Sequence, residues 1–343
     1  MSSARSEATM ADVAHRAGVS VSTVSRTLRG LPTVSETTRA RVEAAARELS
    51  FAITRSASSL VTGRTGRVAV LMPHLESWFL SATLSGMAPA LRDAGLDLLV
   101  YSVTDVQERA DFFDRLPARR NADALLVVSF ALSPAERARL DDLGMPLVFV
   151  SQHAPGRPSV YVDDEEAALR GTRHLLNLGH RRIAFLQTAD RTGFAWSSKN
   201  RLAGHLRALA EAGIEHDDDL VMSVSDWKGS GMAAAVGRLL SLQVPPTALF
   251  AETDDLAFRL LAALREANIP VPGRVSVMGF DDHVMSALMG LTTLAQSAAE
   301  LGRTAVRLTR SVIDDTDGDA PRHIVLPTEL VPRRTTAPPP AGA

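Results

Sequence analysis

The 343-residue sequence contains no cysteine, only two tyrosines, and no apolar run of 18 or more residues. Without cysteine the protein can form neither a disulfide nor a thiolate metal site, which fits a cytoplasmic protein. No segment has the length of a membrane span, and residues 1–10 lack the apolar stretch of a signal peptide. The sequence also lacks G-x-S-x-G, G-x-x-x-x-G-K-[ST] and H-E-x-x-H. We therefore expect no enzyme, no metal site, no cofactor and no membrane partner.

Charge is distributed unevenly along the chain. The whole sequence has 37 basic and 39 acidic residues, a net charge of −2. Residues 1–66 hold nine arginines against five acidic residues, which leaves 28 basic and 34 acidic residues for the rest. A basic N-terminal part on an acidic body suits a protein that touches phosphate at one end only.

Residues 9–28 have the pattern of two short helices joined by a glycine turn. Thr9 and Asp12 form a capping-box pattern at the start of the first helix, and Gly18 ends it. The apolar face of this helix has the spacing i, i+3, i+4 and i+7 and consists of Met10, Val13, Ala14 and Ala17. Ser20 can cap the second helix, whose buried side would be Val24 and Leu28. A helix-turn-helix for the DNA major groove is the functional interpretation, and an ordinary helical hairpin is the alternative.

The amino-acid sequence of this segment favours DNA binding over an ordinary helical hairpin. It reads TMADVAHRAGVSVSTVSRTL and fits T-x-x-D-V-A-x-x-A-G-V-S-x-x-T-V-S-R-x-L, which resembles the headpiece of the lac repressor family position by position. Ser35 can cap a third helix, whose apolar stripe is Val42, Ala45, Ala46 and Leu49. We therefore predict a DNA-binding headpiece over residues 1–52.

The second helix supplies the expected base contacts. The guanidinium of Arg26 can chelate guanine O6 and N7 in the major groove. The resemblance places Val21 and Ser22 at the family's base-choosing positions and Arg29 where the family usually has Asn. Hydroxyl side chains are expected either to bind phosphates or to cap helices, and these are Thr9, Ser20, Thr23, Ser25 and Ser35.

Residues 53–66 form the predicted hinge or linker. Composition alone favours a flexible Ser/Thr/Gly-rich linker. The resemblance instead implies a hinge helix, because Ala57 and Leu60 match the end of the family pattern Y-x-P-N-x-x-A-R-x-L. In relatives this leucine wedges into a minor-groove base step. The sequence departs from that pattern at Phe51, Ile53, Thr54 and Ser58.

From Arg67 onward, short apolar runs alternate with amphipathic helical stretches. The predicted strands are Val68–Met72, Leu96–Tyr101, Ala124–Val128, Leu147–Val150, Ile183–Leu186, Ala248–Ala251 and Val275–Phe280. Such alternation predicts an α/β fold with parallel sheets covered by helices on both faces, and there are too many strands for one sheet. The order resembles the periplasmic-binding-protein-like core of the same family, which implies two doubly wound lobes.

The resemblance sets the expected boundaries of the core. It implies a core over residues 67–336 and a tail over 337–343, with the chain crossing between lobes near Asp163, Thr293 and Pro321. The first lobe would hold residues 67–162 and 294–320, and the second 163–293 and 321–336. Ligands bind such folds in the cleft outside the strand C-termini.

Several core residues are candidates for that cleft. Arg201, in R-L-A-G, resembles the family's effector-binding arginine, and Trp227 corresponds to its stacking aromatic. Asp281, in G-F-D-D, follows a strong strand, and its carboxylate can accept two hydroxyl hydrogen bonds. Asp254 matches the family's A-N-D run, although Thr253 replaces the Asn.

Other candidates keep two interpretations. Asp163 either contacts the ligand or caps the following helix. Trp78 and Phe79 either line the cleft or pack the lobes, and Gln296 lies at an expected crossover.

Together these features predict a ligand-responsive transcriptional regulator, most simply a repressor. It would bind a palindromic operator as a homodimer or dimer of dimers, because one headpiece reads only a few base pairs. A sugar is the preferred effector, and a purine-like corepressor is the alternative. A solute-binding protein is a further alternative, against which the helix-turn-helix counts.

Overall fold

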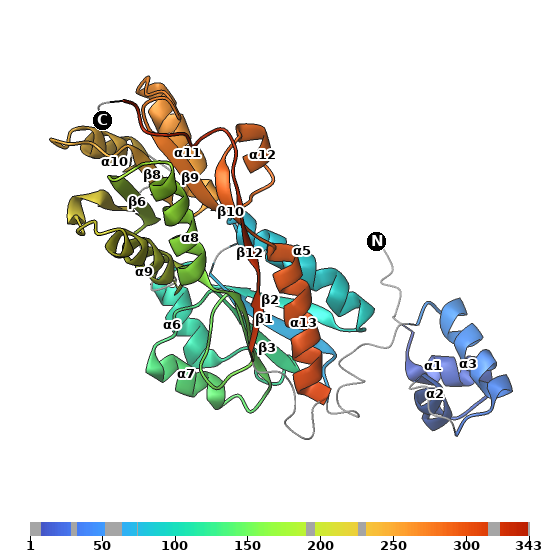
Figure 1. The fold of residues 1–343 in the computed structure, drawn as a ribbon. Coiled ribbons are helices and arrows are strands. Elements are labelled where there is room, and N and C mark those ends of the chain that lie inside the picture. The colour runs from blue at the N-terminus through green and yellow to red at the C-terminus, as the bar shows by residue number, and fades with distance from the viewer. Residues whose placement is uncertain are drawn as a thin grey trace, which may run out of the picture. The chain divides into compact units, whose positions relative to one another are not determined.

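The computed structural model describes residues 8–28, 33–51, 64–73, 75–189, 196–225, 231–314 and 323–341 (Figure 1). The chain divides into two compact units, Met1–Thr65 and Gly66–Ala343. We call them the headpiece and the core and describe each by itself.

The headpiece contains three short helices around a small apolar centre. They are α1 (Met10–Ala17), α2 (Val21–Leu28) and α3 (Glu36–Glu48). The residues of the centre come from all three helices and are Val13, Ala14, Ala17, Val24, Val42, Ala45 and Ala46. The predicted apolar faces are therefore the ones that pack together, which confirms the three-helix headpiece.

The turn between α1 and α2 depends on a glycine. Gly18 has a φ of 64°, in the left-handed region that glycine adopts at little cost. The guanidinium of Arg41 on α3 donates hydrogen bonds to the carbonyls of Ala17 and Gly18, so α3 covers the end of α1. A side chain at position 18 would meet this guanidinium at 2.9 Å.

The core contains two six-stranded sheets, which define two lobes (Figure 1). The first lobe has the order β11-β5-β4-β3-β1-β2, and all of its strand pairs are parallel. Its strands are β1 (Arg67–Met72), β2 (Asp97–Ser102), β3 (Ala124–Val128), β4 (Leu147–Val150), β5 (Ser159–Val162) and β11 (His323–Leu326). Helices α5 (Trp78–Asp93) and α13 (Ala298–Asp314) cover one face, and α6 (Val106–Arg115) and α7 (Pro134–Asp141) cover the other.

The second lobe has the order β12-β10-β9-β8-β6-β7, with β12 antiparallel to β10. Its strands are β6 (Ile183–Thr188), β7 (Val221–Val224), β8 (Ala248–Ala251), β9 (Ser276–Asp281), β10 (Thr292–Gln296) and β12 (Thr328–Val331). Helices α8 (Asp164–Asn177) and α9 (Trp196–Glu211) cover one face, and α10 (Gly231–Leu240) and α11 (Asp254–Glu266) the other. A 3-10 turn, Asp218–Leu220, precedes β7, and the short helix α12 (Ser286–Met289) precedes β10.

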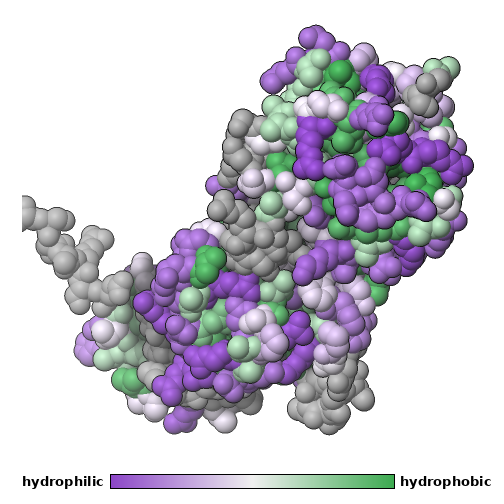
Figure 2. Space-filling model, turned by 90° about the vertical axis from the view of Figure 1, so that its left-hand side faces the viewer, coloured by the Kyte–Doolittle hydropathy of each residue, from purple (hydrophilic) through white to green (hydrophobic). Residues whose placement is uncertain are grey.

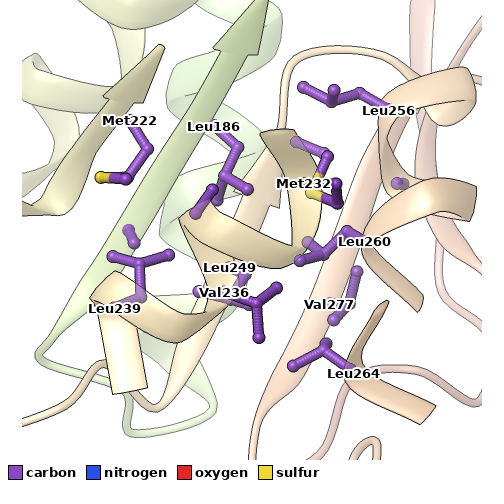
Figure 3. Packing of buried hydrophobic residues seen from close by; sticks show 14 of the residues in the cluster. Leu186, Met222, Met232, Val236, Leu239, Leu249, Leu256, Leu260, Leu264 and Val277 are labelled. Atoms are coloured by element: carbon purple, nitrogen blue, oxygen red, sulfur yellow. The ribbon is translucent and has the colours of Figure 1, made fainter. Parts of the chain in front are cut away.

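The layer under α10 and α11 shows how the lobes are stabilised. In Figure 3 side chains of both helices lie over those of the sheet. The labelled residues are Met232, Val236, Leu239, Leu256, Leu260, Leu264, Leu186, Met222, Leu249 and Val277. Full burial of one such aliphatic side chain is worth roughly 1.5–3 kcal/mol. The two six-stranded sheets, each covered by helices on both faces, confirm the predicted two-lobed α/β architecture.

All seven predicted runs form strands, but five further strands were not predicted. These are β5, β7, β10, β11 and β12, which have four or five residues each and lie at or next to a sheet edge. The edge strands β7, β11 and β12 include partly or fully exposed residues. They therefore lack the continuous apolar run that marks the central strands of a parallel sheet.

Two of the three predicted lobe crossings were wrong in position. Residues 294–296 belong to β10 of the second lobe, so the second crossing follows Gln296. Strand β11 pairs with β5 in the first lobe, so the third crossing lies at Pro327, between β11 and β12. Proline has no N–H for a ladder, which suits a residue between two strands in different sheets. The first crossing, near Asp163, is where the sequence placed it.

The tail also differs from its predicted boundary. The backbone N–H of Ala337 donates to the Ser276 hydroxyl of the second lobe, and the Ala337 carbonyl accepts from that hydroxyl and from the buried His180. The second lobe therefore continues beyond residue 336.

Two glycines allow α5 and α13 to pack closely. A Cβ at Gly86 would lie 2.0 Å from the carbonyl oxygen of Ala299, and one at Gly302 would lie 2.1 Å from that of Thr83. Because backbone atoms occupy these positions, no side chain fits without separating the helices. Helix α5 lies before the first crossing and α13 after the second. Their close packing therefore holds together the two chain segments that form the first lobe.

The face seen in Figure 2 is mostly hydrophilic, with small separate hydrophobic areas. Among the described helices, none combines the length and hydropathy that crossing a membrane requires.

Candidate DNA interface and effector cleft

Helix α2 presents one polar face outward. Val24 and Thr27 are buried against the headpiece, whereas Val21, Ser22 and Arg26 are exposed. The exposed three are the residues predicted to contact bases. Thr27 is buried as well, beside the predicted Val24 and Leu28. At 100° per residue, position 27 lies about 60° from position 24, on the side opposite Leu28, so it widens the buried face.

Several predicted phosphate contacts serve as helix caps in the headpiece. Thr9 and Asp12 form the capping box of α1, and Ser35 accepts from the backbone N–H of Thr38 at the start of α3. The Ser20 hydroxyl accepts from the backbone N–H of Thr23 at 3.2 Å. These contacts match the capping interpretation.

Ser20 also joins a small hydroxyl cluster. Its Oγ lies 2.8 Å from Ser22 Oγ and 2.9 Å from Thr23 Oγ1, while Ser25 is partly buried. Hydroxyl groups hydrogen-bonded in this way are held in fixed directions at the start of α2. Four predicted contacts lie outside the described residues, namely Arg29, Ala57, Leu60 and Trp227.

In the core, Arg201 lies at the centre of a buried charged cluster. Its side chain is 4% exposed, and its Nε donates to Asp164 Oδ1 at 2.8 Å. Its Nη1 donates to the Glu252 carbonyl at 2.5 Å and lies 3.8 Å from Asp281 Oδ1. The guanidinium also stacks on the Phe280 ring, 3.6 Å from the centroid.

Asp281 ends β9 in a strained backbone conformation. Its φ of 122° lies in a region that L-residues rarely adopt. Its Oδ1 accepts from Gln296 Nε2 at 2.7 Å. Burial raises the pKa of Asp281 well above its usual range, and the charge of Arg201 opposes this rise only in part.

Glu252 follows β8 and has polar but uncharged partners at its carboxylate. It accepts from the Thr188 backbone N–H at 2.5 Å and from the Ser198 hydroxyl. Burial raises its pKa, although these hydrogen bonds favour the charged form. Burial likewise raises the pKa of Asp164 against the influence of Arg201.

Topology places this cluster beside the first lobe. Asp164 directly follows the first crossing, and Gln296 directly precedes the second. Glu252 directly follows β8, and Asp281 ends the neighbouring strand β9, which pairs with β10. The cluster therefore occupies the carboxyl edge of the second sheet, where a cleft between lobes is expected.

Asp254 differs from its predicted role as an effector contact. It is fully buried, and its Oδ2 accepts from the His283 backbone N–H and the Ser286 hydroxyl while Oδ1 accepts from the Thr293 hydroxyl. Gly279 makes room for it, because a Cβ there would lie 2.1 Å from Asp254 Oδ1. The carboxylate thus holds together the second lobe and is enclosed by it.

For the remaining predicted cleft residues, the structure matches one of the two interpretations given for each. Trp78 of the first lobe lies against His283 of the second, with ring centroids 4.7 Å apart, so it contacts the other lobe. Phe79 packs partly buried against the first lobe's core. Asp163 is exposed and accepts from the Glu166 backbone N–H, which is the capping interpretation.

Sequence reasoning missed three residues of this region. Asp164 and Glu252 belong to none of the motifs named above, although Glu252 directly follows the buried strand β8, which is itself a signal. Trp196 begins α9 and, with Gln152, His153 and Arg157 of the first lobe, lines a cavity. The segments that follow β6 and β7, 190–195 and 226–230, lie outside the described residues.

Comparison with known proteins agrees with this division of the chain. Residues 9–52 match the model of the bacterial regulatory proteins of the lacI family, and residues 172–336 match a periplasmic binding protein-like domain. The HTH-type transcriptional regulator DegA of Bacillus subtilis (strain 168) is 31% identical over 342 residues, covering 96% of this chain and 98% of DegA.

Solved structures extend the similarity to the whole fold. The lac repressor dimer bound to operator and the anti-inducer ONPF has a TM-score of 0.84 at 26% identity, covering 97% of this chain and 100% of that one. The transcriptional regulator CelR in complex with cellobiose has a TM-score of 0.70 at 27% identity, covering 96% and 100%. With its helix-turn-helix headpiece and two-lobed core, the chain belongs to the lacI family of DNA-binding transcriptional regulators.

Proposed function

We propose that this protein is a repressor whose operator affinity is controlled by a small carbohydrate bound between the core lobes. The observation that carries the proposal is the acceptor-rich cluster around Arg201 at the carboxyl edge of the second sheet. Hydroxyl groups both donate and accept, so a polyol can satisfy carboxylates and a guanidinium together. The cellobiose complex of CelR supports a sugar over the purine-like alternative.

A homodimer is the expected DNA-binding form, as in the lac repressor complex. Two headpieces related by a twofold axis read two half-sites of a palindrome. The core has an apolar surface for a second copy at α12, where four large side chains are exposed: Val284, Met285, Leu288 and Met289. An apolar group of this kind on an otherwise hydrophilic surface is typical of an interface.

An effector can control operator affinity only if it binds one arrangement of the two lobes more tightly than another. We expect a sugar that binds the cleft to change operator affinity by roughly 5–150-fold, and by linkage operator changes sugar affinity by the same factor. The measurement is fluorescence anisotropy of a labelled operator, selected from random DNA, as the protein is titrated into it with and without each sugar. A response to nucleobases and none to sugars would contradict the carbohydrate effector.

Base readout by Arg26 can be tested with the same operator. Arg26→Ala is expected to weaken operator binding by roughly 1–3 kcal/mol and to relax the preference at one base pair per half-site, because only this side chain offers a planar donor pair on the exposed face of α2. Arg16→Ala is the control, since Arg16 is paired with Glu48 at 2.5 Å. If Arg26→Ala weakens binding to random DNA as much as to operator, Arg26 touches only phosphate.

A further inference from the structure

A cavity of about 90 Å³ lies where the first lobe meets the start of α9 in the second lobe. Helices α7 and α9 lie on the same side of the core in Figure 1, and residues of both belong to the wall of the cavity. None of the three carboxylates of the Arg201 cluster lines it. A water molecule needs roughly 10–15 Å³ of such space, so the cavity has room for a group of several heavy atoms.

The residues that line this cavity come from three segments that meet around it. Arg137 and Asp141 are four residues apart on α7 and therefore share one face of that helix. Gln152 and Arg157 belong to the segment between β4 and β5, and Arg157 is bonded to Asp141 at 2.5 Å, which joins this segment to α7. The second lobe contributes Trp196. These polar groups therefore surround one space.

Gln152 has a hydrogen-bond donor that the described part of the chain does not use. The residue is 4% exposed, and its Oε1 accepts from the Phe130 backbone N–H, which fixes the orientation of the amide. Its Nε2 has no partner among the described residues and is not fully enclosed by protein atoms. A nearly buried amide N–H that borders a cavity needs an acceptor there, either water or a ligand.

Two further side chains in the wall have unused donors. Arg137 is exposed, and its guanidinium makes one long hydrogen bond, 3.4 Å from Nε to the Leu132 carbonyl, and no ion pair within the described residues. Trp196 is partly exposed, packs in none of the apolar clusters of the core, and has an indole N–H without a described partner. His153 can donate or accept. The wall is thus rich in donors.

The wall also carries a positive charge. Asp141 is the acidic residue that lines the cavity, and it is paired with Arg157, so Arg137 adds a charge that this carboxylate does not offset. An ionised phosphate or carboxylate accepts hydrogen bonds at its oxygens and forms its strongest ones with cationic donors. A neutral polyol brings donors as well as acceptors, and the side chains here offer few acceptors. An oxyanion therefore matches the wall better than a neutral sugar.

We propose that this cavity binds an oxyanion, a phosphate or a carboxylate, with Arg137 and Gln152 as its donors and Trp196 as its contact in the second lobe. Because such an anion touches both lobes, it stabilises the arrangement in which α9 lies against the first lobe. The regulator would then respond to an anion as well as to the ligand of the Arg201 cluster. The oxyanion is either a free anion or the acidic group of a sugar.

The test is isothermal titration of the full-length protein with inorganic phosphate, glucose 6-phosphate, glucuronate and glucose at constant ionic strength. Arg137→Gln removes the charge of an exposed side chain and should leave the fold intact. It should weaken the binding of the anions about tenfold, because a hydrogen bond to a charged group contributes at least this much, and leave any glucose binding unchanged. Arg92→Gln is the matched control and should bind the anions as the wild type does. Arg92 is equally exposed but ends α5, on the other face of the first sheet.

Two more variants test the other contacts. Gln152→Glu keeps the acceptor for the Phe130 N–H but replaces the free donor by a second oxygen, so it should weaken anion binding at least as much as Arg137→Gln. Binding of the anion should change the tryptophan fluorescence of the wild type, and Trp196→Phe should lose most of this change.

The outcomes distinguish the source of the oxyanion. Inorganic phosphate that binds as tightly as the acidic sugars indicates a free anion, and tighter binding of glucose 6-phosphate or glucuronate indicates a group carried by a sugar. Either result supports the site. If none of the three anions binds, or if Arg137→Gln and Gln152→Glu bind them as the wild type does, the proposal is overturned.

The same measurements keep this inference apart from the carbohydrate effector. A neutral sugar that changes operator affinity, without any anion binding, would overturn the oxyanion site alone. Anion binding that depends on Arg137, without a response of operator affinity to any sugar, would overturn the carbohydrate effector alone.

Discussion

Arg201→Ala is expected to lower the free energy of unfolding of the core by about 3–5 kcal/mol. The side chain is 4% exposed, and its removal would leave Asp164 and the Glu252 carbonyl without their donor and Asp281 without the positive charge 3.8 Å away. Uncompensated buried carboxylates are costly because the protein interior solvates charge poorly. Urea unfolding followed by tryptophan fluorescence measures this loss, since all three tryptophans lie in the core.

Arg207 on the same helix is the matched control. It pairs with Glu165 and Glu166, but its side chain is 40% exposed, so water solvates the partners when it is removed. Arg207→Ala should cost less than about 1 kcal/mol. Equal losses in the two variants would show that the Arg201 cluster does not contribute to folding. The resemblance implies that Arg201 contacts the effector, and its buried ion pair with Asp164 also gives it a role in folding.

Asp254→Ala is expected to cost about 3 kcal/mol or more at pH 7, because three buried or partly buried donors lose their acceptor. Asp255→Ala is the control, since Asp255 is partly exposed and lies 3.9 Å from His283. It should cost less than about 1 kcal/mol. Chemical denaturation of both variants against the wild type gives the comparison.

The cost of Asp254→Ala should also depend on pH. Burial raises the pKa of Asp254 to about 6 from 3.8. Between these values the folded protein keeps a proton that the unfolded chain has lost, so the contribution of Asp254 to stability falls as the pH rises. The substitution should therefore cost more at pH 5 than at pH 7. A cost that grows from pH 5 to pH 7 would contradict the raised pKa.

The headpiece was largely predictable from the sequence. Its helices are short and capped, and each has its apolar residues on one face, so local spacing already identifies which side is buried. The capping box at Thr9 and the glycine at position 18 fix the helix ends through neighbouring residues alone. The central strands of the core were predictable for a similar reason, because strands buried on both faces are continuous apolar runs.

The lobe crossings and the effector cluster were decided by the tertiary structure. Strands β10, β11 and β12 are short, and only their pairing shows to which sheet each belongs. Arg201, Asp164, Glu252 and Asp281 come from separate segments, and a sequence pattern does not contain the distances between them. Asp254 and Asp281 both lie at strand or helix ends. Asp254 is enclosed by donors from its own lobe, while Asp281 lies beside Gln296, whose side-chain oxygen has no hydrogen-bond partner among the described residues. The sequence by itself therefore determined the family, the headpiece and the two-lobed fold, because these depend on local periodicity and motif spacing. Which carboxylates support the lobe and which remain for a ligand was decided only by long-range packing.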